Sequence, residues 1–110
     1  MSTHSVPAAE VAELLRRAIR GEVAVTLADP ECPWGEAHTL MGDCEFRIGG
    51  WEVIAFNGYG DFDYVYYVVS PDGRTADYAH WDGYPDGVNP GLMLDFDENA
   101  ELLGLLEMAR

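Results

Sequence analysis

The sequence contains no lysine: its cationic side chains are six arginines, set against twenty aspartates and glutamates. The formal net charge at pH 7 is −14, and the isoelectric point is near 4.2. A surface of this sign repels nucleic acid and anionic membranes, so we expect direct binding to neither. The chain also has no glycine-rich phosphate loop, which together with the missing lysine argues against phosphate chemistry.

Long apolar runs and basic leader segments are absent as well. No stretch approaches the roughly 20 apolar residues that cross a bilayer, and residues 1–15 lack the basic start and apolar core of a signal peptide. These absences predict a cytoplasmic protein. Cysteine is scarce, and the spacing of Cys32 and Cys44 matches no redox or zinc pair. Two thiols are the expectation in the cytoplasm, with a disulfide as the alternative.

The length of the chain predicts a single domain spanning residues 1–110. An apolar content of 48% and an aromatic content of 12% indicate a folded globule rather than a disordered acidic tail.

Apolar residues at helical spacing predict a helix near each end of the chain. The first helix has an apolar stripe within residues 11–19 and ends at Gly21. Its Glu13 is placed to pair with Arg16 or Arg17, one turn further on. This helix is expected to pack on the sheet through its stripe.

The second helix is predicted over residues 97–110, with Asp97 as its N-cap. Glu98 and Glu101 would then lie near the positive end of the helix dipole. Five apolar residues supply its buried face: Leu102, Leu103, Leu105, Leu106 and Ala109.

Gly49-Gly50 separates two alternating runs, a pattern typical of a two-residue β-hairpin turn. That turn sets the register, so that apolar pairs share one face while Arg47 stands opposite Glu52 on the other. The expected apolar pairs are Ile48 with Trp51, Phe46 with Val53, and Cys44 with Ala55. Cys44 is therefore predicted to be a core residue.

A further strand is predicted at residues 64–69, with Asp61 and Asp63 in the loop that enters it. A turn follows, and residues 75–81 return as the partner strand. Two alternatives stay open for the strand at 64–69: it is covered on both sides, or it has one covered side and a tyrosine-lined surface. The predicted fold is α+β, an antiparallel sheet of four or five strands with the N-terminal and C-terminal helices packed on one face.

No motif names a reaction. Asp95 begins a D-x-D-x-N pattern, but Ala100 and Leu106 stand where a calcium loop needs glycine and glutamate. The residues that could be assembled into a zinc site, none at the short spacings such sites use, are Cys32, His38, Cys44 and His80. We therefore expect no enzyme, no metal and no cofactor, with a small hydrolase or metalloprotein as a further alternative.

The acidic excess, which lies wholly within residues 26–110, is interleaved with aromatic residues. Carboxylates steer a basic partner and exposed aromatics anchor it, which predicts a protein interface. The candidate partner-binding residues are Asp77, Asp82, Tyr84, Asp86, Asp95, Asp97, Glu98 and Glu101. A solvated face that only keeps the protein soluble is the alternative.

Residues 46–81 carry the pattern F-x-I-x-G-W, then F-N, then D-Y, then S-P-D-G-R. In this pattern the segment resembles a family of small uncharacterised bacterial domains. The resemblance implies an α+β domain and supplies no activity. In size, acidity and lack of enzyme motifs the chain also resembles phage-encoded anti-defence proteins such as anti-CRISPRs.

We accordingly expect a non-enzymatic protein that inhibits a basic, nucleic-acid-binding partner, such as a defence complex, by mimicking nucleic acid. The alternative is an immunity or accessory protein that neutralises a toxin by covering its active site. The sequence leaves both a monomer and a homodimer open.

Overall fold

The computed structural model describes the chain apart from residues 1–5, 29–33, 35–41, 59–60, 83–87 and 110. Five strands form one antiparallel sheet in the order β1-β2-β3-β4-β5, so each strand pairs with its neighbours in sequence. The strands are β1 (Val25–Leu27), β2 (Gly42–Ile48), β3 (Trp51–Gly58), β4 (Asp61–Val69) and β5 (Thr75–Asp77). The helices are α1 (Ala8–Ile19), α3 (Tyr78–Asp82), the 3-10 helix η1 (Pro90–Met93) and α4 (Phe96–Met108).

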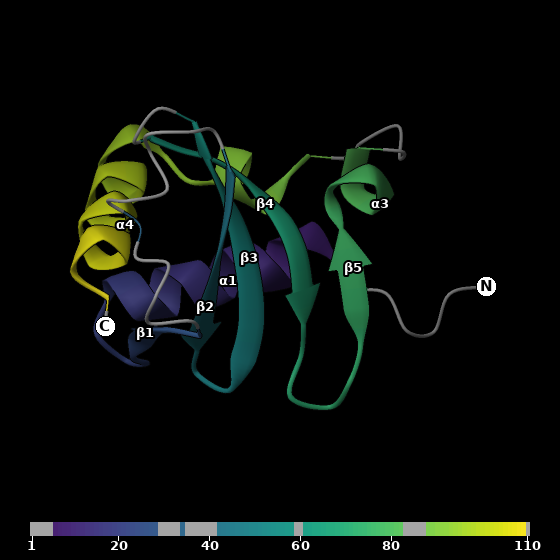
Figure 1. Ribbon diagram of the computed structural model, residues 1–110. Helices are drawn as coiled ribbons and strands as arrows, with labels where there is room; N and C mark the ends of the chain where they lie inside the picture. The colour runs from purple at the N-terminus through teal and green to yellow at the C-terminus, as the bar shows by residue number, and fades with distance from the viewer. Residues whose placement is uncertain (1–5, 29–33, 35–41, 59–60, 83–87, 110) are drawn as a thin grey trace.

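The helices surround the sheet on three sides (Figure 1). α1 crosses behind the strands, α4 lies at the β1 edge, and α3 lies beside β5 at the opposite edge. The predicted α+β class, with five antiparallel strands and a helix near each end of the chain, is confirmed.

The core lies between the sheet and α1, and the hairpin of β2 and β3 supplies its centre. The predicted register is confirmed at every pair, from Ile48 opposite Trp51 to Cys44 opposite Ala55. All six side chains of the three apolar pairs are buried, including the Cys44 thiol. The turn works because Gly49 and Gly50 both adopt positive φ, the backbone of a type I′ turn.

Strand β4 is longer and less regular than the sequence predicted. It begins at Asp61, so the placement of Asp61 and Asp63 in a loop is wrong: both belong to the strand that pairs with β3. The register between β3 and β4 also shifts twice, and one shift leaves Tyr66 as an extra residue. As a result Val65 and Val68, three residues apart, are both buried while Tyr66 between them is exposed. Of the two alternatives, one covered side with a tyrosine-lined surface is confirmed.

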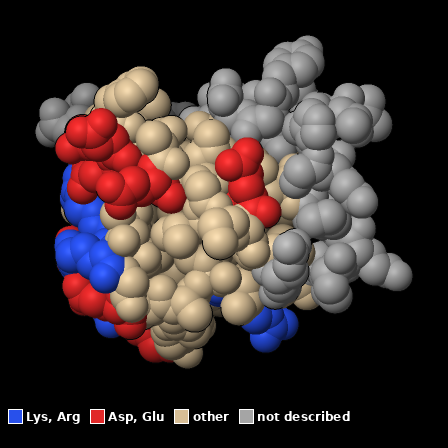
Figure 2. Space-filling view, turned by 90° about the vertical axis from the view of Figure 1, so that its left-hand side faces the viewer, with Lys and Arg blue, Asp and Glu red and all other residues tan. Residues whose placement is uncertain are grey.

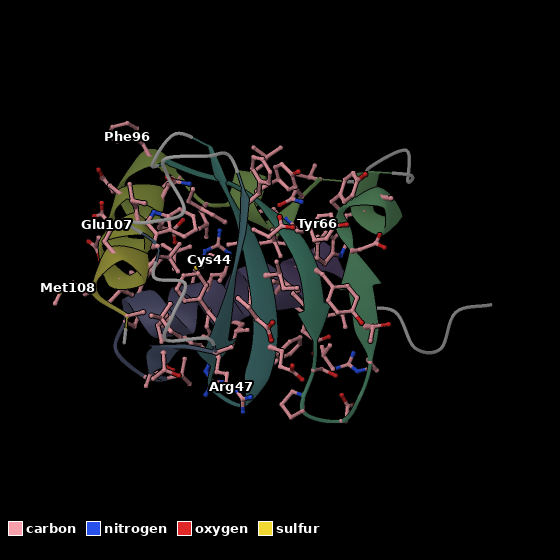
Figure 3. The ribbon with its side chains drawn as sticks, viewed as in Figure 1. Cys44, Arg47, Tyr66, Phe96, Glu107 and Met108 are labelled. Carbon is pink, nitrogen blue, oxygen red and sulfur yellow. The ribbon has the colours of Figure 1, made fainter. Side chains whose placement is uncertain are left out.

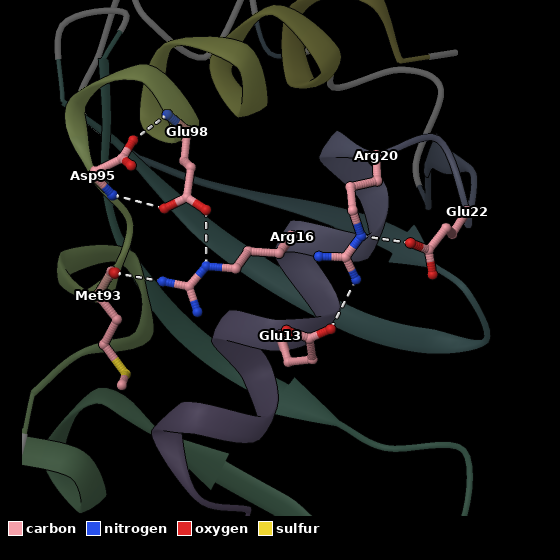
Figure 4. Close-up of polar contacts among 7 residues, drawn as sticks. All are labelled: Glu13, Arg16, Arg20, Glu22, Met93, Asp95 and Glu98. Carbon is pink, nitrogen blue, oxygen red and sulfur yellow. Dashed lines mark hydrogen bonds and ion pairs between the residues drawn. The ribbon is translucent and has the colours of Figure 1, made fainter.

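Helix α1 buries the predicted apolar stripe, but its predicted ion pair is wrong. Glu13 pairs with Arg20 at 2.8 Å, not with Arg16 or Arg17. The cause is tertiary, because α4 packs beside α1 and brings Glu98 within 2.9 Å of Arg16 (Figure 4).

Helix α4 begins two residues earlier than predicted. Its N-cap is Asp95 and not Asp97. The Asp95 carboxylate accepts a hydrogen bond from the Glu98 N–H at 2.7 Å, and the Asp95 N–H donates to the Glu98 carboxylate at 2.9 Å. This reciprocal capping box satisfies two backbone donors at once, an advantage that Asp97 lacks because Ala100 stands three residues after it.

The partner strand predicted for residues 75–81 is only half right. β5 ends at Asp77, and residues 78–82 turn into α3, so His80 lies on a helix and not on a strand. The buried Trp81 explains the turn, since its indole N–H donates to the Val6 carbonyl at 2.9 Å and docks α3 against the start of α1.

Candidate functional site

One face of the sheet is left open by the helices. Along β2, β3 and β5 every second side chain is buried against the core, and the side chains between them are exposed or half-buried. We call this second set, with the β4 residues that share its side, the outer face. It consists of Asp43, Glu45, Arg47, Glu52, Ile54, Phe56, Tyr64, Tyr66, Tyr67, Val69, Thr75 and Asp77, continued by Tyr78 at the start of α3.

Aromatic rings form a continuous ladder across the outer face. The rings of Phe56 and Tyr64 stack with centroids 4.9 Å apart and an interplanar angle of 6°. Tyr64 meets Tyr78 at 5.8 Å, and Tyr78 stacks on Tyr66 at 5.4 Å and 22°. Tyr66 and Tyr78, at the end of the ladder, are 37% and 41% exposed. The ladder therefore presents apolar ring surface to solvent.

Buried Asn89 holds the irregular part of β4 that carries the ladder. Its amide accepts a hydrogen bond from the Val65 N–H at 2.9 Å and donates to the Val65 carbonyl at 2.8 Å. Val65 lies beyond the end of β5, which pairs only with residues 67–69, so the side chain takes the place of a missing strand. Because Val65 stands between Tyr64 and Tyr66, this clamp fixes the backbone on both sides of the two tyrosines.

Three carboxylates of β2 and β3 share the outer face with the ladder. Asp43 is the cross-strand partner of Phe56, Glu45 of Ile54, and Glu52 of Arg47. None of these three acids forms an ion pair with a described arginine. The expected register of Arg47 with Glu52 is confirmed, although their side chains do not reach ion-pair distance.

Asp43 is the outer-face acid with a shifted titration. Partial desolvation raises the pKa of its carboxyl above the usual range, although the side chain as a whole is exposed. Its ionised form is thus partly desolvated, and a cation brought to it would stabilise that form.

The described arginines elsewhere are already occupied within the chain. Arg16, Arg17, Arg20 and Arg74 each pair with at least one glutamate or aspartate, and Arg47 is left as the cation of the outer face. The negative excess is therefore not neutralised where the aromatic ladder is exposed.

The residues that the sequence predicted as a partner-binding site lie on two separate surfaces. Asp77 ends β5 on the outer face, opposite Tyr67, and Asp82 ends α3. Tyr84 and Asp86 lie outside the described residues. The other four, Asp95, Asp97, Glu98 and Glu101, lie on the first turns of α4 or cap it. α3 and α4 are at opposite ends of the molecule (Figure 1). The structure does not bring the set together.

The α4 end of the molecule is chemically different from the outer face. Glu98 is engaged by Arg16 and by the Asp95 N–H, and both contacts lower the pKa of its carboxyl, the backbone hydrogen bond most. Figure 2, which looks onto this end, shows arginines and acidic residues side by side along one edge, and a largely uncharged area with a further acidic group in it. Phe96 and Met108 point away from the sheet here (Figure 3) and are 88% and 74% exposed.

A family model for a domain of unknown function, DUF7693, matches residues 5–108. The chain belongs to this family. The match spans nearly the whole sequence and agrees with the expected membership of an uncharacterised domain family, but it attaches no activity to the fold. Comparison with curated proteins and with solved structures finds no match.

The described part of this DUF7693 domain contains no candidate metal site and no candidate membrane-spanning helix. Among the described residues, no group of three or more His, Cys, Asp or Glu side chains could hold a metal ion. Cys32 and His38, two of the zinc candidates, lie outside them. No helix in the described part of the chain is both long and apolar enough to cross a membrane.

The sequence-based prediction did not include the outer-face acids, although the alternation of side chains in the predicted hairpin indicated them. The predicted hairpin register placed Cys44, Phe46 and Val53 in the core, so their neighbours had to lie on the other face. Asp43, Glu45 and Ile54 follow from that alternation alone.

Proposed function

We propose that this domain is a non-enzymatic binding protein whose outer face docks on a basic surface of a partner protein. The observation that carries the proposal is the aromatic ladder bordered by Asp43, Glu45 and Glu52, three carboxylates without an ion-pair partner among the described residues. Interfaces of this kind combine a ring-rich centre with charges that steer the partner.

Basic protein surfaces are commonly sites for nucleic acid, because duplex DNA carries one negative charge per about 1.7 Å of axis. A domain with a net charge of −14 would compete for such a site. The concrete form of the proposal is an inhibitor of a nucleic-acid-binding protein, of the anti-CRISPR or anti-restriction type. The shared sign of phosphate and carboxylate supports it.

The test begins with immobilised full-length protein and a lysate of the source organism, washed at rising salt. A captured basic protein should elute as salt rises, since counterions screen the charges that bind it. The purified partner is then assayed for nucleic-acid binding with and without the domain. Loss of nucleic-acid binding supports mimicry; loss of a catalytic activity with nucleic-acid binding intact favours the toxin-neutralising alternative.

Two charge-matched variants locate the interface. The outer-face variant carries Asp43→Asn, Glu45→Gln and Glu52→Gln. The control variant carries Asp97→Asn, Glu101→Gln and Glu107→Gln on α4, so each loses three negative charges. Only the outer-face variant should lose binding to the partner. Equal losses would show that net charge and not the outer face is responsible, and capture of no basic protein at any salt would refute the function.

A further inference from the structure

Tyr66 and Tyr78 form an exposed aromatic pair that nothing in the core requires. They come from β4 and α3, and their rings stack with centroids 5.4 Å apart. Both side chains are more than one-third exposed, whereas the neighbouring Val65 and Val68 are fully buried. The fold therefore holds two tyrosine rings together at the surface, where they contribute less to stability than buried rings do.

A ring pair at an acidic surface suits one kind of side chain in particular. The guanidinium of arginine is planar, stacks on aromatic faces and is weakly hydrated, while the ammonium of lysine is compact and strongly hydrated. The outer face offers such rings on β4 and α3, and its β2 carboxylates, two strands away from β4, give the surface its negative charge.

The chain does not fill this site with its own described arginines. Four of them are held in ion pairs, and Arg47 stands opposite Glu52 on β2. None of these contacts involves the Tyr66–Tyr78 pair. The described arginines therefore leave the ring pair open to a cation from another molecule.

We propose that the Tyr66–Tyr78 pair binds an arginine side chain of the partner protein, in preference to lysine. The inference rests on the proposed function and deepens it by naming the partner chemistry at one point of the outer face. Glu45 and Asp43 act as the long-range attraction, and the ring pair supplies the selectivity for the guanidinium.

The probes are hexa-arginine and hexa-lysine peptides, which have equal charge and length, titrated into the full chain at low ionic strength. We expect the arginine peptide to bind about 2–5-fold tighter, the range of one exposed cation–π contact. Its addition should shift the ring-proton resonances of Tyr66 and Tyr78. Calorimetry gives the two affinities, and NMR gives the location.

Variants separate the ring effect from simple charge. Tyr66→Leu with Tyr78→Leu should remove the arginine preference and leave hexa-lysine binding unchanged, while Tyr66→Phe, which keeps the ring, should retain it. Phe96→Leu on α4 is the matched control, because it removes an exposed ring outside the outer face.

Three results of the peptide titrations would count against different parts of the two proposals. Equal affinities for the two peptides on the native chain would refute the arginine preference while leaving the acidic interface intact. A preference that survives the double leucine variant would refute the ring pair as its source. If neither peptide binds, both this inference and the outer-face site of the proposed function fail.

Discussion

Replacing Asn89 by alanine should destabilise the protein far more than its place in a connecting segment suggests. The side chain is 3% exposed and makes three hydrogen bonds, with the N–H and carbonyl of Val65 and the N–H of Gly91. In Asn89→Ala three buried backbone groups lose their partners. The Asn89 side chain is therefore the shared partner of three buried backbone groups.

The magnitude follows from the cost of unsatisfied groups. A buried donor or acceptor left without a partner costs about 1–3 kcal/mol. Three such groups set an upper range near 9 kcal/mol, and water entering the space vacated by the amide would satisfy part of them. We expect a loss of about 3 kcal/mol, a large share of the roughly 5–15 kcal/mol that stabilises a domain.

The assay is urea unfolding followed by the fluorescence of the buried tryptophans Trp34, Trp51 and Trp81. The midpoint should fall at an unchanged m-value, and hydrogen exchange at the Val65 amide should accelerate. Asn99→Ala is the matched control, because the Asn99 side chain makes no hydrogen bond within the described residues; it should change stability by less than about 0.5 kcal/mol. A loss below about 1 kcal/mol for Asn89→Ala would refute the clamp.

Two further predictions concern glycine and pH. Gly104→Ala should stabilise the protein by about 0.5–1 kcal/mol, because the residue is inside α4 and an added methyl meets nothing within 4 Å. Gly49→Ala should destabilise the protein, since φ at Gly49 is +54°. Thermal unfolding of the two variants should show shifts in opposite directions. The pKa of the Glu98 carboxyl is lowered by the hydrogen bond from the Asp95 N–H and, to a smaller extent, by Arg16. The ionised Glu98 side chain therefore stabilises the fold at neutral pH. This stabilisation is lost as the pH falls below about 4.3, the ordinary glutamate pKa, and through the lowered pKa of the folded state. Glu98→Gln should therefore lose less stability than the native chain between pH 7 and pH 3; equal losses in urea unfolding at the two pH values would contradict this.

The hairpin of β2 and β3 was predictable because a single local feature decides it. Gly49-Gly50 fixes the turn type, the turn fixes the register, and the register fixes which side chains face the core. The N-cap of α4 was wrongly predicted as Asp97, although Asp95 with Glu98 three residues later matches the capping-box pattern better than Asp97 does.

The tyrosine face of β4 was not predictable in the same way. Strict alternation would place Val65 and Tyr67 on the same side of β4. The extra residue Tyr66 shifts the alternation, so the residues after it lie on the opposite sides from those expected. Nothing in the local sequence marks that shift, because it is held by Asn89, 24 residues away. The separation of the predicted acidic set is likewise tertiary: Asp77 and Asp95 are 18 positions apart in sequence but lie at opposite ends of the fold.

The order of the strands has a consequence for how the chain assembles. Every strand pairs with the one before or after it, so the sheet can grow by short loop closures while the chain is still being synthesised. α1 depends on the far end of the sequence, because its Arg16 is joined to Glu98 across 82 positions. Helix α1 thus completes its contacts only after α4, which follows it in the chain, has been synthesised. A chain interrupted before α4 would lack the contacts between α1 and α4, so the packing around α1 is completed by α4.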